Sequence, residues 1–264
     1  MKWLVSHRSK HTKYDSEMGI EFRNSKQNSL TLIVCYIINL ASRPDRKKHA
    51  FDQVSKFQLN STFLEAVSVE ELGPKNLGFL TPPAMACWQS HIKVFESFLM
   101  TNEPCVVIFE DDFRIKDMTV LERLIQRLDL EDFEIVQIGF LVNNFREKID
   151  ISLKNFEFVI FSILSRLCVR NSILRARFGD RLRVQRASGV PFGFVPDDLR
   201  AGAHAYIISR SAALRIITEF REQNVLTADG FLIASNWTRP FRTLRVHRSF
   251  VDQINSPSSI RIQT

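Results

Sequence analysis

The chain has 264 residues, a length that suits one large domain or two small ones and allows a sizeable hydrophobic core. Hydrophobic residues make up 45% of it and charged residues 25%, which is typical of a soluble globular protein rather than a disordered or membrane-embedded one. The formal net charge of +7 favours anionic partners such as nucleotides, nucleic acid or an acidic membrane surface.

The cysteines lie far apart and lack the short spacing of a disulfide framework or a zinc site; they are Cys35, Cys87, Cys105 and Cys168. This usage predicts reduced thiols packed in the core. The start of the chain has no apolar segment of the signal-peptide kind, and the longest apolar run, 30–40, is about half of the roughly 20 residues that a membrane-spanning helix needs. We therefore expect a cytoplasmic protein that can rest peripherally on the inner face of the membrane.

Residues 1–29 are polar, mixed in charge and without periodicity, which predicts a loose N-terminal extension. The remainder, 30–264, is expected to form a single domain. Its expected elements are strand 31–40, a helix from Pro44, strand 63–69, a helix capped by Thr81, strand 106–109, helix 120–128, strand 134–141, strand 203–209 and helix 212–220. Strands that alternate with helices in this way predict an α/β fold with a mostly parallel central sheet flanked by helices.

A basic insertion at 143–200 breaks this alternation. On a continuous helix, four of its arginines would share one face beside an apolar one; they are Arg166, Arg170, Arg177 and Arg181. Neighbouring faces of this kind are typical of a helix lying on an anionic membrane, so we expect peripheral membrane contact from Ile160 to Arg186. A solvated basic face packed on the core, or one that binds an acidic glycan, explains the pattern equally well.

Glu110, Asp111 and Asp112 follow directly on the apolar run 106–109, which reads as a buried strand. Carboxylates this close repel one another unless a cation or basic groups neutralise them. Mg²⁺ or Mn²⁺, held by one or two carboxylates and by diphosphate oxygens, would do so at the carboxyl end of a strand, where open α/β sheets bind their ligands. The alternative is an acidic N-cap for the next helix.

Four segments in order resemble glycosyltransferase family 25, the lipopolysaccharide glycosyltransferases that include the collagen galactosyltransferases. They are Ile38-Asn39-Leu40 with Arg43-Pro44-Asp45-Arg46, Leu80-Thr81-Pro82 with Ala86-Cys87 and Ser90-His91, Ile108-Phe109-Glu110-Asp111-Asp112, and 202–209. The resemblance implies a fold of the GT-A type, a metal-dependent site and a nucleotide-sugar donor. By position, Asp112 would be the principal metal ligand and Glu110 would contact metal or ribose. Asp111 would support these ligands without contacting the metal itself, or would orient a base.

The resemblance also implies nucleotide-binding roles for Asn39, Arg43 and Arg46, which follow the first strand and suit phosphate or base contacts. Solvated residues at a helix start are the alternative for the two arginines. Ser90 and His91 join the nucleotide site only through the family motif. His91 lies on an otherwise apolar helix face, where a hydrogen-bonded core histidine is as well supported as a ligand contact.

Asp229 and Gln253 complete the candidate site, because each stands where the family has the same residue type. Asp229 follows the last predicted helix and would be the catalytic general base of an inverting transfer, although it could also be a plain turn residue. Among the other late acids, Asp198 is the main rival for that role.

The leading hypothesis is therefore an inverting, metal-dependent hexosyltransferase. It would move galactose or glucose from a UDP-sugar to a hydroxyl of a lipopolysaccharide-type or other glycan or glycolipid. A metal-dependent phosphoesterase and a basic module that binds membrane or nucleic acid are the alternatives. Nucleic acid is the weaker partner, since the sequence has no zinc-finger, RRM-type or helix-turn-helix signal.

Overall fold

The computed structural model describes residues 33–72, 80–128, 133–170, 190–220, 227–235 and 241–254. The predicted N-terminal extension, 1–29, lies outside the described residues, as does 171–186, the second part of the segment expected to meet a membrane.

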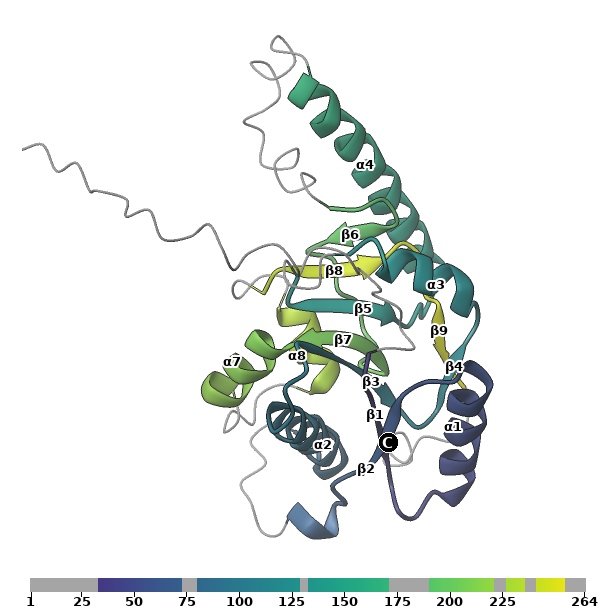
Figure 1. Ribbon diagram of the computed structural model, residues 1–264, viewed down its shortest axis with the longest axis vertical. Helices are drawn as coiled ribbons and strands as arrows, with labels where there is room; N and C mark the ends of the chain where they lie inside the picture. Colours follow the sequence, from purple (N-terminus) through teal and green to yellow (C-terminus); the bar gives the residue numbers. More distant parts are fainter. Residues whose placement is uncertain are drawn as a thin grey trace, which may run out of the picture.

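Seven strands form one mixed sheet in the order β2-β1-β3-β7-β5-β8-β6 (Figure 1). They are β1 (Cys35–Asn39), β2 (Ser61–Glu65), β3 (Cys105–Glu110), β5 (Ile135–Gly139), β6 (Phe194–Pro196), β7 (Ala205–Ser209) and β8 (Thr243–Val246). β7 is antiparallel to both of its neighbours and β6 is antiparallel to β8, whereas the other pairings are parallel. Strands β2, β1, β3, β5 and β8 therefore share one direction, and the mostly parallel α/β sheet is confirmed.

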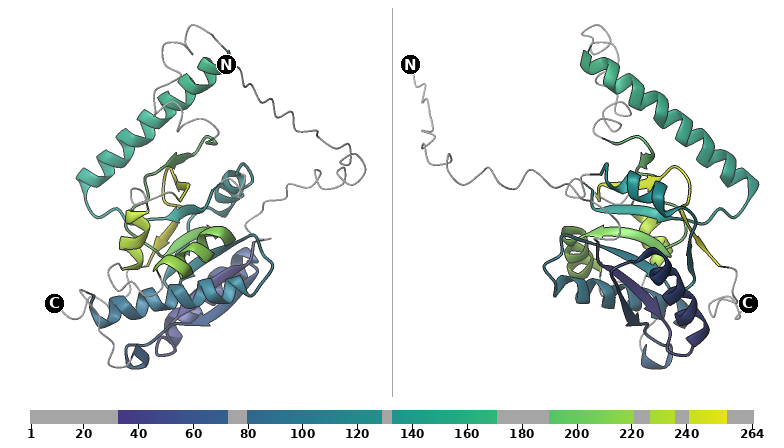
Figure 2. Two further views of the ribbon diagram at one scale, coloured as in Figure 1. Left: turned by 90° about the vertical axis from the view of Figure 1, so that its left-hand side faces the viewer. Right: turned by 45° about the vertical axis from the view of Figure 1, so that its right-hand side comes forward.

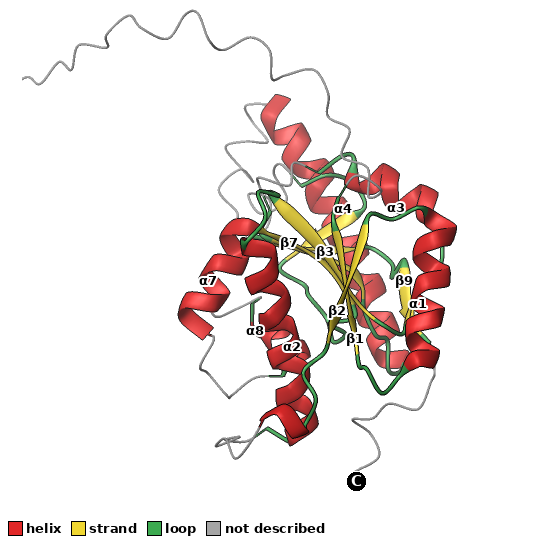
Figure 3. Cartoon of the chain, turned by 60° about the horizontal axis from the view of Figure 1, so that its bottom comes forward, coloured by secondary structure: helices red, strands yellow, loops and turns green. Residues whose placement is uncertain are grey.

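Helices cover both faces of this sheet (Figure 3). One face carries α1 (Pro44–Phe57), α3 (Met118–Ile125) and α4 (Phe145–Arg170), and the other carries α2 (Pro82–Leu99), α7 (Arg210–Phe220) and α8 (Ala228–Ala234). A short 3₁₀ helix, η1, spans Glu70–Leu72. Alternate residues of the central strands enter two separate apolar cores, one under each helix layer. Strands that are apolar on both faces, as predicted from the continuous runs, are what such a three-layer arrangement needs.

The helix starts follow local chemistry. Pro44 and Pro82 open α1 and α2, where a missing backbone N–H costs nothing. Thr81 stands at the N-cap of α2 with extended backbone, as predicted, although its side chain makes no capping hydrogen bond within the described part of the chain. Side chains do cap α3 and α8, through Asp117 and Thr227.

The sequence analysis did not predict four of the described strands, because each has only three or four residues. Two of them, β6 and β8, close one edge of the main sheet. The other two, β4 (Phe113–Ile115) and β9 (Val251–Gln253), form a separate antiparallel pair. This pair ties the late part of the chain to the residues just after the acidic segment, and it thereby helps to build the site.

Helix α4 occupies the first part of the basic insertion and lies at the end of the molecule opposite η1 (Figures 1 and 2). Its inner face packs through Ile151 and Phe158 on the core. Its outer face carries an exposed apolar row with a spacing of three or four residues: Phe145, Ile149, Leu153, Phe156, Ile160, Ile163 and Leu167. None of the helices in the described ranges combines the length and the apolar character needed to span a bilayer.

Candidate active site

The acidic segment stands at an edge of the sheet where several loops meet. Glu110 is the last residue of β3 and lies in register with Ile38 of the parallel strand β1, so Asn39 and the start of α1 reach the same edge. Strand β7 runs the opposite way beside β3, and residues just before it arrive there too. Pairing of Phe113 with Gln253 brings β9 to the same place.

Arg46 and Gln253 each bridge two of the three carboxylates. One Arg46 nitrogen, Nη1, lies 3.1 Å from Asp111 Oδ1 and 3.1 Å from Asp112 Oδ2. Gln253 Nε2 donates to Asp112 Oδ2 at 3.1 Å and lies 3.5 Å from Glu110 Oε2. The chain continues from Asp112 into strand β4 and not into a helix, so the alternative of an acidic helix cap is wrong.

Asp111 is held from the first loop. Asn39 Nδ2 donates to Asp111 Oδ2 at 2.8 Å, and Arg46 pairs with the other oxygen. Burial raises the pKa of Asp111, although Asn39 and Arg46 act in the opposite direction. Both of its oxygens therefore have partners from the protein, and Asp111 positions Arg46 and Asn39.

One carboxylate oxygen of Asp112 has no hydrogen-bond partner among the described residues. Its side chain is buried, yet Asp112 Oδ1 makes no hydrogen bond. Burial and the nearby charge of Glu110 raise the pKa of this carboxyl to about 7. Burial also acts on Glu110, but the imidazoles of His91 and His204 lower its pKa overall. A buried acceptor without a donor is costly, so this oxygen suits a cation, and the donor set fits the divalent metal that the resemblance implies.

Two cavities meet at these carboxylates. The larger, about 280 Å³, lies between the ends of β1, β2 and β3 and the start of α2. Its wall includes Ile38, Ser42, Arg46, Val67, Ser90, His91, Asp111 and Asp112. The smaller, about 210 Å³, is lined by Ala84, Leu141, Gly202, Ala203, His204, Thr227, Ala228 and Asp229. Cys87, Glu110 and Gln253 line both, so Glu110, the first of the three acids, stands on the wall between them.

Asp229 lies in the first turn of α8 and lines the smaller cavity together with Glu110. Its Oδ1 accepts a hydrogen bond of 2.6 Å from the backbone N–H of Ala203. Burial and the charge of Glu110 raise the pKa of Asp229, while backbone N–H groups of Ala203 and Gly202 oppose the shift. The loop can approach this closely because Gly202 adopts φ +110°, a backbone conformation that favours glycine.

His91 is both a core histidine and a cavity residue, which joins the two alternatives left open by the sequence. It is buried, and its Nδ1 lies 2.8 Å from the hydroxyl of Tyr206. Its Nε2 lies 3.5 Å from Glu110 Oε1. Ser90 instead serves the fold, since its hydroxyl donates to Ala86 O and accepts from the backbone N–H of Val67.

Arg43 differs from Arg46. Its guanidinium pairs with Asp45, at 2.8 Å from Asp45 Oδ2, and the wall of the larger cavity is formed by its neighbours Ser42 and Arg46. Asp198, the rival base, lines neither of the two cavities. Its carboxylate is buried against Arg245, with Arg245 Nη2 2.6 Å from Asp198 Oδ2.

The sequence analysis missed Cys87 and His204 as site residues. Cys87 lies one helical turn before His91, so its position on the same face of α2 could have been read from the spacing. His204 is buried, with Nε2 3.0 Å from Val251 O, and it lines the smaller cavity. Its role depends on the contact between β9 and the loop before β7, which no local pattern shows.

Known proteins resemble this chain in sequence. Residues 33–232 match the model of glycosyltransferase family 25, described as an LPS biosynthesis protein. The probable inactive glycosyltransferase 25 family member 3 of Bos taurus is 25% identical over 158 residues, which are 52% of this chain and 24% of that protein. The inactive glycosyltransferase 25 family member 3 of Mus musculus is 27% identical over 122 residues, 40% of this chain and 20% of that protein. The chain thus matches about a quarter or less of the length of these relatives.

A solved structure, the galactosyltransferase LgtC in complex with donor and acceptor sugar analogues, aligns with 85% of this chain and 88% of its own at 13% identity and a TM-score of 0.39. The α/β sheet flanked by helices, which the resemblance implied as the GT-A type, is confirmed by the strand order and directions. The family match extends over more than half of the chain, and the protein therefore belongs to glycosyltransferase family 25.

Proposed function

We propose that this protein is an active, metal-dependent hexosyltransferase that uses a UDP-sugar, with galactose or glucose as the sugar, and a glycan hydroxyl of the lipopolysaccharide type as acceptor. The observation that carries the proposal is the position of the acid cluster, which lines the larger cavity and reaches the wall shared with the smaller one through Glu110. A transferase needs a place for its donor and another for its acceptor, with the reacting bond between them.

The larger cavity suits the nucleotide diphosphate. Arg46 is an always-charged donor on its wall, and Asn39 helps to fix it through Asp111. Asp112 Oδ1 and the carboxylate of Glu110 would hold Mn²⁺ or Mg²⁺. Such a cation would neutralise the acids and stabilise the leaving diphosphate. Gln253 reaches over both carboxylates and would orient them.

Asp229 is the base that this arrangement favours. An inverting displacement needs a proton acceptor on the side of the sugar opposite the leaving group, and Asp229 faces the smaller cavity from α8 while Asp111 and Asp112 line the larger one. Its raised pKa makes the carboxylate a better proton acceptor than an ordinary aspartate. The backbone N–H of Ala203 holds one oxygen, which fixes the orientation of the group.

Helix α4 supports the further proposal of contact with an anionic membrane that carries a glycolipid acceptor. Its outer apolar row includes Phe156, 66% exposed, and Leu153, 63% exposed. The exposed Arg166 stands beside the row, and the chain as a whole is cationic. A helix with this pattern can bury its apolar face among headgroups while its cations meet anionic lipids. Phe156→Ser should lower binding to anionic vesicles in a sedimentation assay; unchanged sedimentation would contradict the contact.

Calorimetric titration with UDP tests the metal-dependent donor site. Wild-type protein should bind UDP with Mn²⁺ and lose several kcal/mol of that binding in EDTA or in Asp112→Asn. Asp252→Asn is the matched control, because Asp252 neighbours Gln253 but pairs with Lys116 at 2.8 Å, away from the acids. Equal affinity with and without metal, or in Asp112→Asn, would refute the proposal.

Release of UDP from a panel of UDP-sugars then separates the enzyme classes. A transferase should release UDP faster when a glycan acceptor is added, and the favoured sugar identifies the donor. Hydrolysis that ignores the acceptor would indicate a phosphoesterase. UDP binding without any turnover would indicate a binding module; the names of the two curated relatives describe those proteins as inactive or probably inactive.

A further inference from the structure

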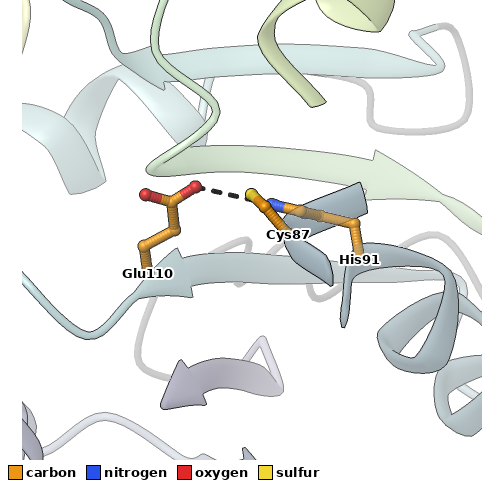
Figure 4. A group of neighbouring side chains, drawn as sticks. All are labelled: Cys87, His91 and Glu110. Carbon is orange, nitrogen blue, oxygen red and sulfur yellow. Dashed lines mark ion pairs between the residues drawn. The ribbon is translucent and has the colours of Figure 1, made fainter. Parts of the chain in front are cut away.

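A cysteine, a histidine and a carboxylate converge on the wall between the two cavities (Figure 4). Cys87 Sγ, a ring nitrogen of His91 and a carboxylate oxygen of Glu110 all lie within 4.8 Å of one another. These three atoms are the ligand types that Zn²⁺ takes in proteins: thiolate sulfur, imidazole nitrogen and carboxylate oxygen. The cysteines are too scattered in the sequence for a cysteine-rich zinc site, but this set needs only one of them.

The fold itself brings the three side chains together. Cys87 and His91 are separated by one turn of α2, so both side chains project from the same face of that helix. Glu110 approaches from the end of β3, the strand over which this face lies. Two ligands from a rigid helix and one from a strand end are geometrically well defined before any ion binds, which lowers the entropy lost on binding.

The environment of the His91 ring nitrogens points to a bound ligand. Its side chain is 1% exposed, and its Nε2, which lies 3.5 Å from Glu110 Oε1, is a buried atom without a hydrogen-bond partner among the described residues. The opposite nitrogen, Nδ1, lies 2.8 Å from the Tyr206 hydroxyl. With the proton on Nδ1, donated to Tyr206, the lone pair of Nε2 faces Cys87 and Glu110. Metal-binding histidines are oriented in this way by an outer partner on their second nitrogen.

We propose that Cys87, His91 and Glu110 form a site for a borderline divalent cation of the zinc class, separate from the Mn²⁺ or Mg²⁺ position at Asp112. Three protein ligands leave a fourth position open, here toward the cavities that Cys87 and Glu110 both line. Binding replaces the S–H bond of Cys87 by a sulfur–metal bond and releases the proton to solvent. His91 and Glu110 bind as neutral imidazole and carboxylate.

The site shares Glu110 with the acid cluster, and this gives it a consequence for the transfer reaction under the proposed function. A zinc-class ion would hold Glu110 toward α2 and stand between the two cavities. Micromolar Zn²⁺ should therefore inhibit sugar transfer even when Mn²⁺ is in excess, and Cys87→Ser should relieve that inhibition.

Metal binding can be measured without any turnover. Wild-type protein should compete with a chromophoric chelator for one Zn²⁺, and Co²⁺ in its place should show the sulfur-to-metal charge-transfer absorption of a thiolate ligand. Cys87→Ser and His91→Gln should each lower zinc affinity by more than the roughly 10–100-fold that loss of an outer partner costs, and Cys87→Ser should abolish the charge-transfer band. Tyr206→Phe, which removes only the outer partner, should lower affinity by that smaller factor.

Two controls keep this proposal independent of the proposed function. Cys168→Ser removes a buried thiol on α4 and should leave both the zinc affinity and the cobalt spectrum unchanged. Asp112→Asn should lose metal-dependent UDP binding but keep zinc, so failure of one site does not count against the other. Zinc binding that survives Cys87→Ser unchanged in a folded variant, or a cobalt spectrum without the thiolate band, would overturn the zinc site.

Discussion

Two clusters of charged side chains in this protein, each with a buried aspartate and a buried arginine, differ in how fully their carboxylates are paired. In the first, Arg46 faces Glu110, Asp111 and Asp112 at the cavity wall. The second lies where α4 packs near β6 and β8, and consists of Asp150, Lys154, Asp198, Arg200 and Arg245.

In the second cluster both carboxylates pair with cations of the protein. Asp198 Oδ1 lies 2.9 Å from Lys154 Nζ and 2.8 Å from Arg200 Nη2. Its Oδ2 accepts from Arg245 Nη2 at 2.6 Å and Nε at 3.1 Å. Arg245, with a side chain 0% exposed, also donates to Val246 O and to Asn155 Oδ1. This network ties α4, β8 and the loop after β6 together, so its role is to hold the fold.

The first cluster has three carboxylates for one guanidinium, and it leaves Asp112 Oδ1 without a donor. Its deficit of positive charge faces a cavity instead of a neighbouring helix. The comparison teaches that burial of charge does not by itself mark a functional site. Negative charge that is only partly neutralised beside a cavity does mark one, because a ligand can bind there and supply the missing positive charge or hydrogen bond.

Asp198→Asn is the sharpest test of whether the second cluster stabilises the fold. This change leaves Arg245 buried without its counter-ion, and loss of one partner of a buried pair costs about 3–5 kcal/mol of unfolding free energy. Urea denaturation followed by circular dichroism measures it. A loss below about 1 kcal/mol would mean that the second cluster does not hold the fold.

The next largest effect is expected for Asp229→Asn in the transfer reaction. The amide can still accept from Ala203 N but cannot take a proton, so kcat should fall about 10²–10⁴-fold while UDP binding persists. Because its pKa is raised, wild-type activity should decline with falling pH from above the ordinary range of an aspartate. A wild-type acid limb unshifted from that range, or near-normal turnover in Asp229→Asn, would assign the base elsewhere.

Asp112→Asn should act on stability in the opposite direction from Asp198→Asn. Its folded-state pKa of about 7 lies above that of an unfolded aspartate, so the ionised form weakens the metal-free fold as pH rises to 7 and beyond. At pH 8 in EDTA the asparagine variant should therefore unfold at equal or higher urea concentration, with a gain of up to a few kcal/mol. Destabilisation of the size expected for Asp198→Asn would show that both clusters serve the fold.

The smallest expected effect concerns an exposed charge and its contribution to membrane binding. Arg166 is exposed on α4, and its removal should weaken binding to anionic vesicles by about 1 kcal/mol, roughly fivefold. Arg114→Gln is the control, since Arg114 is exposed on β4, away from α4. Vesicle sedimentation at low salt measures both; equal losses, or none, would count against a membrane-facing α4.

Local patterns were enough for much of the fold and for part of the site. Apolar runs located β1, β3, β5 and β7, and the proline-led turns located α1 and α2. Position after a buried strand singled out Glu110 and Asp112. The short strands β6 and β9 were missed, because three residues carry too little periodicity to stand out, and with β9 the contacts of Gln253 were missed as well.

What the sequence by itself determined is which segments become strands and helices, since backbone geometry and burial of apolar runs act over a few residues. It also determined that three carboxylates end one strand. Tertiary structure alone decided how those carboxylates are compensated. Among the described residues, Asp112 keeps an unpartnered oxygen while Asp198 has none, although each aspartate stands just after a strand, β3 or β6, in a chain of positive net charge. That difference arises from side chains brought together by strand pairing and helix packing, and electrostatic energy depends on those distances, which the order of residues along the chain does not contain.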